Sequence, residues 1–267
     1  MGGRKNPSSI VITGATGGIG NALARHYAAP GVSLCLTGRD RQRLEQIAED
    51  CRQAGAEVVA AAVDVRDRDA LYDALRGFDE RTPVDLLIAN AGVSAGLRAG
   101  GQRETDEEAE RLADINYKGT INTVHALIDQ MRARKSGHIA MVSSLAGMRA
   151  LPEMPSYSAT KAAIIAYGDS LRGWLKTDRI DITVICPGFV TSPMSARHIG
   201  PKPLEISAEK AAGIISRGLA RRRSRIAFPW PLVFGIWLSK FLPPKIADLF
   251  MNGFAAEIEP DPRDWSK

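Results

Sequence analysis

The sequence is poor in cysteine and in long apolar runs. Its three cysteines are an odd number, and they show neither a Cys-x-x-Cys pair nor the Cys and His spacing of a metal site. We therefore expect no disulfide framework, no metal site and a reduced, cytoplasmic protein in which Cys35 and Cys186 are small core residues. No uninterrupted apolar run is long enough to span a bilayer. The run after the basic amino terminus is also too short for a signal peptide.

Acidic residues are outnumbered, and the formal net charge is +5. Much of the excess is local, at Arg39–Arg43 and Arg221–Arg225. No basic stripe interleaved with aromatic residues and no nucleic-acid-binding motif accompanies it. We therefore predict that nucleic acid is not a partner.

Short apolar runs alternate with segments of helical period along the 267 residues. The expected strands are Ile10–Thr13, Val32–Thr37, Glu57–Val63, Val84–Ala89, His138–Val142, Ile182–Cys186 and Arg225–Phe228. The expected helices are Arg41–Ala54, Asp67–Phe78, Glu104–Arg134, Ser158–Thr177 and Ala208–Leu219. This alternation predicts an α/β fold, a doubly wound parallel sheet with helices on both faces, whose ligands bind at the carboxyl ends of the strands. Without repeats or long linkers, we expect one domain over 1–267, with a core over 9–228 and an extension over 229–267.

A glycine-rich turn follows the first expected strand. The run Ser9–Thr13 leads into Gly14-Ala-Thr-Gly-Gly18-Ile-Gly20, and a helical stretch begins at Asn21. Glycines let the backbone approach a pyrophosphate, and the amides at the helix start favour an anion. The turn predicts a dinucleotide site; the alternative is a βα turn that binds nothing.

Tyr157 and Lys161 stand four residues apart, with a serine pair, Ser143 and Ser144, upstream. Residues i and i+4 of a helix share one face. A cation about 4 Å from a phenol, at an effective dielectric of about 20, contributes about 4 kcal/mol, or about 3 pKa units. We therefore expect Tyr157 to titrate near ~7, where a general acid–base catalyst works best. A solvated helix face gives the same spacing, so the pair indicates a catalytic site only in combination with the other motifs.

Taken together, these motifs resemble those of the short-chain dehydrogenase/reductase family, in its single-domain branch. The resemblance runs from about Ser9 to about Phe228, with Ser144 thirteen residues before Tyr157. It implies seven strands in the order 3-2-1-4-5-6-7. It also implies cofactor contacts at Gly14, Thr16, Gly18, Ile19, Gly20, Arg39, Asp64, Val65, Asn90, Ala91, Gly92, Tyr157, Lys161, Pro187, Gly188, Val190 and Ser192.

The resemblance also implies the catalytic roles. Tyr157 carries the proton, Lys161 lowers its pKa and binds the nicotinamide ribose, and Ser144 binds the carbonyl oxygen. Asn116 holds a water that links Lys161 to solvent; its alternative is a helix residue bonded to backbone. Ser143 is the rival of Ser144, because alternation along a strand points neighbours to opposite faces.

The choice of cofactor depends on the end of the second strand, where a NAD site usually carries a carboxylate. Gly38 occupies that position and Arg39 follows it, and a guanidinium suits a 2′-phosphate. We therefore favour NADP(H) over NAD(H). Against this, Asp40 is adjacent, although it fits a helix N-cap, and Gly17 stands where many NADP-using relatives carry a basic residue. Asp64 equally fits a loop carboxylate or a cap.

The segments after the sixth strand are expected to shape the substrate site. Relatives bind the carboxamide through backbone at the position of Val190 and a hydroxyl at that of Ser192, with Thr191 as the competing residue. The stretch from Pro193 to Glu205 is the expected substrate lid. The apolar, proline-broken stretch 229–254 is expected to cover the substrate cleft or a subunit interface; the alternative is a peripheral contact with an anionic membrane.

The leading hypothesis is an NADP(H)-dependent oxidoreductase that interconverts a secondary alcohol and a ketone or aldehyde. Its substrate would be a small molecule, and the apolar lid and tail suggest a hydrophobic one. Two alternatives stay open: a non-catalytic regulatory protein that binds a dinucleotide, and a membrane-surface enzyme that acts on a lipid-like substrate. Relatives pair through their two long helices, so a homodimer or homotetramer is expected.

Overall fold

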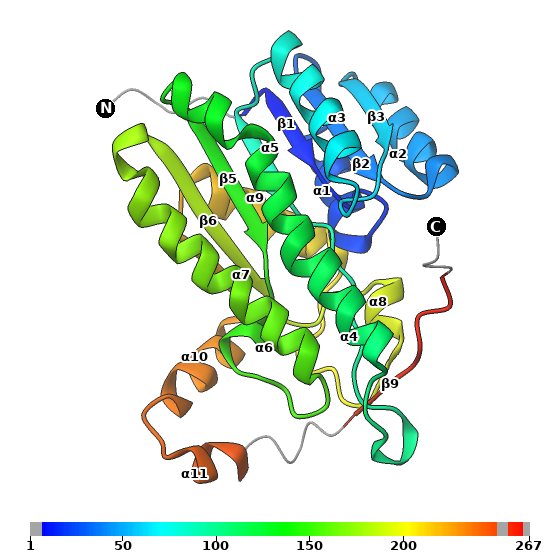
Figure 1. Cartoon of the computed structure of the whole chain (residues 1–267), viewed down its shortest axis with the longest axis vertical. Helices are drawn as coiled ribbons and strands as arrows, with labels where there is room; N and C mark the ends of the chain where they lie inside the picture. The colour runs from blue at the N-terminus through cyan, green and yellow to red at the C-terminus, as the bar shows by residue number, and fades with distance from the viewer. Residues whose placement is uncertain (1–6, 250–255, 264–267) are drawn as a thin grey trace.

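A seven-stranded parallel sheet forms the centre of the molecule (Figure 1). The computed structural model describes residues 7–249 and 256–263. The strands of the sheet are β1 (Ser9–Ile12), β2 (Ser33–Gly38), β3 (Glu57–Ala62), β4 (Leu86–Ala89), β5 (Gly137–Val142), β6 (Ile180–Pro187) and β8 (Arg225–Phe228). Their order is β3-β2-β1-β4-β5-β6-β8, and every pair is parallel. This confirms the expected doubly wound sheet and its strand order.

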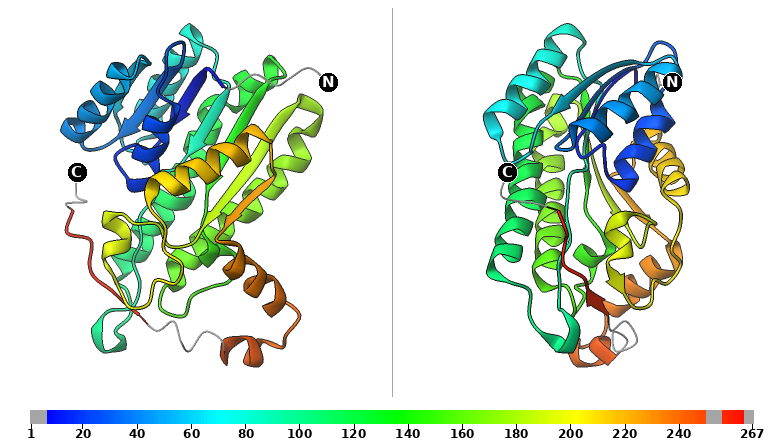
Figure 2. Two further views of the ribbon diagram at one scale, coloured as in Figure 1. Left: turned by 180° about the vertical axis from the view of Figure 1, so that it is seen from behind. Right: turned by 90° about the vertical axis from the view of Figure 1, so that its right-hand side faces the viewer.

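Helices cover both faces of the sheet (Figure 2). The longer helices are α1 (Gly18–Tyr27), α2 (Arg41–Gln53), α3 (Arg68–Arg81), α4 (Asp106–Leu112), α5 (Gly119–Ala133), α7 (Pro155–Trp174) and α9 (Ala208–Ala220). Apolar residues of α3, α4, α5 and α7 pack in one cluster, and those of α1, α2 and α9 pack in the other. The strands are apolar on both faces because each face is covered. Cys35 and Cys186 are fully buried core residues, as expected.

The long helix expected over Glu104–Arg134 is divided. A π-helical segment, η2 (Ala113–Lys118), separates α4 from α5, and Asn116 lies in it. Single π turns inside α-helices occur frequently at functional sites. Apolar periodicity does not reveal such a turn, because the same face stays buried before and after it.

The remaining elements gather at the carboxyl edge of the sheet, except η3, which precedes β6 at the amino edge. They are η1 (Ala99–Gly101), α6 (Leu145–Met148), η3 (Leu175–Asp178), α8 (Pro193–Ala196), β7 (His198–Ile199), α10 (Trp230–Ser239), α11 (Pro244–Leu249) and β9 (Glu257–Ile258). Helices α10 and α11 confirm a helical extension, while its expected continuation to Phe254 lies outside the described residues. The antiparallel pair β7–β9 was not expected, since two-residue strands leave no period to detect.

The basic run and the apolar extension are separated by strand β8. Arg221–Arg223 precede the amino end of β8, and α10 begins just after its carboxyl end. A strand rises about 3.3 Å per residue, so the two features lie on opposite edges of the sheet. The basic run and the apolar extension therefore lie at opposite ends of β8.

Candidate active site

The glycine turn packs tightly against the loop that follows β4. Gly14 has φ +65°, and a Cβ there would lie 2.7 Å from Ala91 Cα. A Cβ on Gly20 would lie 2.3 Å from Gly14 O. Only glycine fits both positions without a shift of backbone. The turn thus opens α1 with bare backbone, which is the cradle that a diphosphate requires.

Asn90 ties the two sides of this cradle together. Its amide donates to Thr13 O at 3.0 Å and to Gly14 O at 3.1 Å. The Thr13 hydroxyl in turn accepts from the amides of Asn90 and Ala91 at 3.1 and 3.3 Å. Asn90 therefore fixes the turn and the Asn90–Gly92 loop, with Ala91 and Gly92 facing the same cavity.

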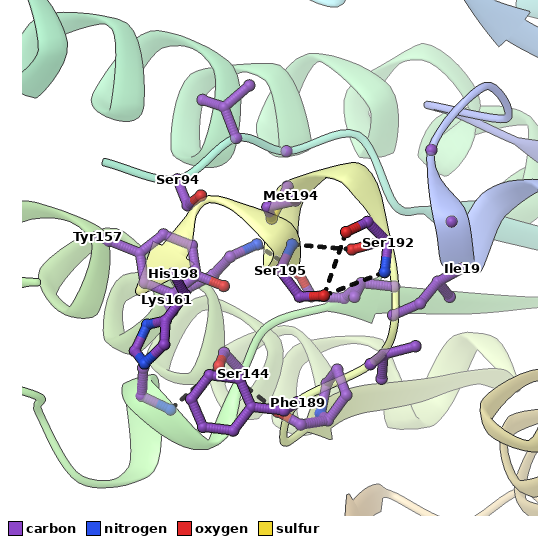
Figure 3. A pocket seen from close by; sticks show the side chains of 18 of the residues that line it. Ile19, Ser94, Ser144, Tyr157, Lys161, Phe189, Ser192, Met194, Ser195 and His198 are labelled. Carbon is purple, nitrogen blue, oxygen red and sulfur yellow. Dashed lines mark hydrogen bonds between the residues drawn. The ribbon is translucent and has the colours of Figure 1, made fainter. Parts of the chain in front are cut away.

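One cavity of about 1120 Å³ joins the glycine turn to the Tyr157 helix. Its lining includes every predicted cofactor residue except Gly20, and it also includes Ser144; Asn116 does not line it. Figure 3 shows Ser144, Tyr157 and Lys161 on one side of this cavity and Ile19 on the other. The volume exceeds that of a typical small-ligand pocket, so two molecules fit end to end.

Tyr157 and Lys161 lie in the first turns of α7, whose helix begins at Pro155. Lys161 Nζ lies 5.7 Å from the centre of the phenol ring and donates to Val142 O at 3.0 Å. The Lys161 side chain is therefore anchored to the end of β5, beside the phenol.

The pKa shifts of this pair differ from the sequence prediction. Burial raises the pKa of Tyr157, and only the Ser144 hydroxyl, by hydrogen bonding, opposes it. Burial also lowers the pKa of Lys161 to about 8. Without a ligand the cavity disfavours the charged form of both groups. The expected phenol pKa near 7 is thus wrong for the cofactor-free protein, because desolvation was left out of the prediction.

The serine pair divides as strand alternation requires. Ser143 is buried and donates to Lys161 O at 2.7 Å, so it is a structural link to α7. Both serines line the cavity, but Ser144 caps α6 by accepting from Ala146 N at 3.1 Å and forms a hydrogen bond with Tyr157. The geometry therefore favours Ser144 over Ser143 as the residue that faces a substrate.

Asn116 is fully buried, and its side chain bonds to protein groups. Its amide donates to Val93 O at 3.0 Å and to Thr160 Oγ1 at 3.1 Å, and its Oδ1 accepts from Val93 N at 2.8 Å. These contacts correspond to the alternative of an Asn bonded to backbone. Asn116 connects the π turn to the loop after β4 and to α7, beside Lys161. It therefore holds this loop and this helix in place without lining the cavity.

Arg39 and Asp64 form one side of the cavity, at the ends of β2 and β3. Arg39 Nε lies 3.8 Å from Asp64 Oδ2, and Arg66 Nη2 lies 2.8 Å from the same oxygen. Burial, and then the charges of Arg263 and Arg66, lower the pKa of Arg39, while Asp64 and Asp261 oppose the shift. Asp40 caps α2 by accepting from Arg43 N at 2.9 Å, as expected.

The segment after β6 folds back over the glycine turn. Pro187, Gly188, Val190 and Ser192 all line the cavity. Ser192 and Ser195 form a capping box with bonds of 3.0 and 3.1 Å, drawn dashed in Figure 3. Thr191 instead bonds through backbone to Ile206, so Ser192 is the hydroxyl that faces the cavity.

The extension supplies lining residues at both ends of the cavity. The sequence did not identify these residues individually. Inward-facing residues of α10 and the loop after it form an apolar wall: Pro231, Leu232, Gly235, Ile236, Leu238, Ser239 and Leu242. Beyond the undescribed stretch, residues 258–263 line the other end. His198, which packs edge-to-face on Phe189 with ring centres 4.8 Å apart, also lines this space. No sequence motif marks these residues, because their positions depend on tertiary contacts.

Metal-ligand clusters and membrane-spanning helices are both absent from the residues that the structure describes. Within 7–249 and 256–263, no group of three or more His, Cys, Asp or Glu side chains is placed to hold a metal ion. Over the same ranges, no helix combines the length and the hydropathy needed to cross a membrane.

Comparisons with known proteins agree with this geometry. The family model described as short chain dehydrogenase matches residues 8–200. An uncharacterized oxidoreductase of Myxococcus xanthus (strain DK1622) is 34% identical over 241 residues, which cover 90% of this chain and 94% of the relative. A short-chain dehydrogenase/reductase from Burkholderia phymatum in complex with NAD superposes with a TM-score of 0.80 at 22% identity, covering 94% and 97% of the two chains. An alcohol dehydrogenase from the archaeon Thermococcus sibiricus, complexed with 5-hydroxy-NADP, gives a TM-score of 0.73 at 26% identity, covering 83% and 95%.

Proposed function

Because the chain belongs to the short-chain dehydrogenase/reductase family, we propose that it is an NADP(H)-dependent oxidoreductase that interconverts a secondary alcohol and a ketone or aldehyde. One observation carries the proposal. Ser144, Tyr157 and Lys161 converge on a cavity that continues to a glycine cradle for a dinucleotide. A protein that only sensed a dinucleotide would have no use for this proton-handling group.

The roles follow from the positions of the side chains. The bound nicotinamide supplies or accepts the hydride. Tyr157 gives the proton to the substrate oxygen in reduction and takes it in oxidation. Its raised pKa keeps the phenol protonated at neutral pH before the cofactor binds, which is the form that donates. Ser144 donates a hydrogen bond to the same oxygen; loss of such a donor typically costs about two to three decades in rate.

Lys161 is suited to replace the proton that Tyr157 gives up. Its pKa of about 8 lies close to neutral pH, so it gains and loses a proton at little cost. When charged, it also stabilises the phenolate that forms beside it. Asn116 acts in this scheme as a positioning residue, since it holds the loop and helix between which the Lys161 amine lies.

The cofactor preference is supported by charge. The Thermococcus relative is complexed with an NADP derivative and the Burkholderia structure with NAD, so kinship supports a nicotinamide dinucleotide of either kind. In this chain the end of β2 carries Gly38 and Arg39 at the position where a NAD site usually has a carboxylate. A Cβ on Gly38 would lie 3.1 Å from Thr16 Cγ2, so a longer acidic side chain would also meet Thr16. We therefore retain NADP(H) over NAD(H).

The substrate class is supported by the wall at the Tyr157 end. Leu232, Ile236 and Leu242 of the extension face Met154 and Phe189 across the cavity. Apolar side chains there favour a hydrophobic carbonyl compound or alcohol over a sugar-like one, which would leave its hydroxyls unpaired.

A contact with a membrane surface remains a second proposal, carried by the outer face of the extension. Trp230, Phe234, Trp237 and Phe241 are 75%, 55%, 52% and 70% exposed. They follow helical spacing, and neighbouring rings contact one another. Exposed aromatic stripes of this kind suit the interfacial region of a bilayer. A lipid-like substrate would then enter from the same side, and a second protein subunit is the competing occupant.

The test is a panel of hydrophobic ketones and secondary alcohols, scored by nicotinamide absorbance with NADPH and NADH side by side. Tyr157→Phe should abolish turnover and leave the NADPH dissociation constant nearly unchanged. Tyr167→Phe is the matched control, because it removes a hydroxyl from the same helix outside the cavity lining. Turnover retained in Tyr157→Phe would contradict the mechanism. Wild-type protein that binds NADPH but turns over no compound would favour the non-catalytic alternative.

A further inference from the structure

The described end of the chain crosses the mouth of the proposed dinucleotide site. Residues 256–263, here named the C-terminal strap, run from β9 along the carboxyl edge of the sheet toward β2 and α2 (Figure 1). Six of its residues line the same cavity: Ile258, Glu259, Pro260, Asp261, Pro262 and Arg263. The strap therefore forms part of the wall that a bound dinucleotide would contact.

Backbone bonds fix the strap to loops from both sides of the cleft. Ile258 N donates to Leu97 O at 2.8 Å, in the loop after β4. Glu259 N donates to Arg197 O at 2.9 Å, in the segment after β6. Ile258 is 4% exposed, and a Cβ on Gly96 would lie 2.7 Å from its Cγ1. The strap thus bonds to two loops, which Arg197 and Ser94 also connect directly.

Arg197 is the centre of this connection. Its guanidinium donates to Glu259 O at 3.0 Å and to Ser94 O and Oγ at 3.0 and 2.9 Å. It also lies 3.6 Å from Asp261 Oδ2. The Asp261 side chain is 3% exposed and accepts from Arg263 Nε at 2.8 Å. Asp261 therefore connects the buried Arg197 to Arg263 and fixes the direction of the latter.

Arg263 is held near Arg39. Both line the same cavity, and the charges that act on Arg39 come from Asp64, Arg263, Arg66 and Asp261. Arg39, Arg66 and Arg263 therefore gather around Asp64 and Asp261 at the end of the site where the 2′ position of the adenosine ribose belongs, and Asp40 and Arg43 also line the cavity. A 2′-phosphate would relieve the repulsion between the arginines, and a 2′-hydroxyl would not.

We propose that the C-terminal strap closes over the dinucleotide and that Arg263 joins Arg39 in binding the 2′-phosphate of NADP(H). This inference rests on the proposed function, since it assigns residues of the chain to the same cofactor. It makes the far end of the sequence a determinant of cofactor choice, and it makes cofactor release depend on breaking the Arg197 and Asp261 contacts.

The test measures binding, without turnover. Dissociation constants of 2′,5′-ADP and 5′-AMP are determined by calorimetry for wild type, Arg39→Ala, Arg263→Ala and Arg221→Ala. Arg263→Ala should weaken 2′,5′-ADP about tenfold, as expected for one charge-assisted bond, and leave 5′-AMP within about twofold. Arg221→Ala removes an exposed charge at the opposite edge of the sheet and should change neither. Arg263→Lys should recover part of the loss.

The outcomes separate the inference from the proposed function. If wild type binds 2′,5′-ADP no better than 5′-AMP, the NADP(H) preference itself fails. If wild type prefers 2′,5′-ADP and Arg39→Ala removes the preference while Arg263→Ala has no effect, only the role of Arg263 is refuted. Amide hydrogen exchange of residues 256–263 supplies a second readout. It should slow with NADPH more than with NADH, and equal exchange with and without NADPH would refute closure of the strap.

Discussion

Replacing Lys161 by methionine should change how the stability of the cofactor-free protein depends on pH. Burial lowers the pKa of Lys161 from 10.5 to about 8. Between these values the unfolded chain binds a proton that the folded protein does not, so the free energy of unfolding rises with pH. One pKa unit corresponds to about 1.4 kcal/mol, so the full effect is about 3 kcal/mol, of which about 2 kcal/mol accumulates between pH 7 and pH 9.5.

Other groups act in the opposite direction over the same range. Burial raises the pKa of the Cys35 thiol to about 12. Burial also raises the pKa of the Cys51 and Cys186 thiols. These thiols stay protonated in the folded protein after they ionise in the unfolded chain, so they lower stability as pH rises. The absolute slope is therefore mixed, and only the difference between wild type and Lys161→Met isolates the lysine.

The assay is urea unfolding from pH 7 to pH 9.5. Lys161→Met also leaves Val142 O without its donor, which costs stability equally at every pH. The free energy of wild type minus that of the variant should grow by about 2 kcal/mol over this range. Lys176→Met, which removes an exposed lysine just after α7, controls for the loss of one charge. A difference that stays constant with pH would refute the buried, near-neutral state of Lys161.

Two further predictions concern the cradle and the outer face of the extension. Gly20→Ala places a Cβ 2.3 Å from Gly14 O, so NADPH binding measured by fluorescence should fall at least about tenfold. The control is Gly77→Ala, in open space on α3, which should raise stability by about 0.5–1 kcal/mol and leave binding unchanged. Normal binding in Gly20→Ala would show that the turn tolerates a side chain. Wild type should co-sediment with anionic liposomes at low salt and the double variant Trp230→Ala/Phe234→Ala should not, and failure of wild type to co-sediment would end the membrane proposal.

The sequence predicted the elements whose signal is local. The inner strands of the main sheet, such as β1 and β4, are short apolar runs, and parallel strands buried on both faces produce such runs. Ser144 was preferred to Ser143 because of its spacing to Tyr157 in the family resemblance, and in the structure the Ser143 hydroxyl bonds to Lys161 O instead. Asp40 was identified as a cap from its position before a helix, and its side chain caps α2.

The features that the sequence did not reveal share a different origin. The pKa of Tyr157 was derived from one neighbouring charge, and burial, which no spacing reveals, reverses its direction. The partners of the Asn116 side chain lie on segments distant in the chain, at Val93 and Thr160. The π turn that carries Asn116 keeps the apolar face of the helix, so periodicity passes over it.

The extension shows most clearly why sequence motifs stop short of specificity. Residues 9–228 carry the groups that we propose handle the proton, and the glycine cradle that we propose binds the diphosphate. The residues after 228 contact the two ends of the ligand space that those groups leave open: α10 the substrate end, and the C-terminal strap the adenosine end. No spacing rule places the strap, because its position depends on the backbone of two distant loops, at Leu97 and Arg197. The motifs therefore fix the class of reaction, and we expect the choice of substrate and cofactor to follow the walls that the extension supplies.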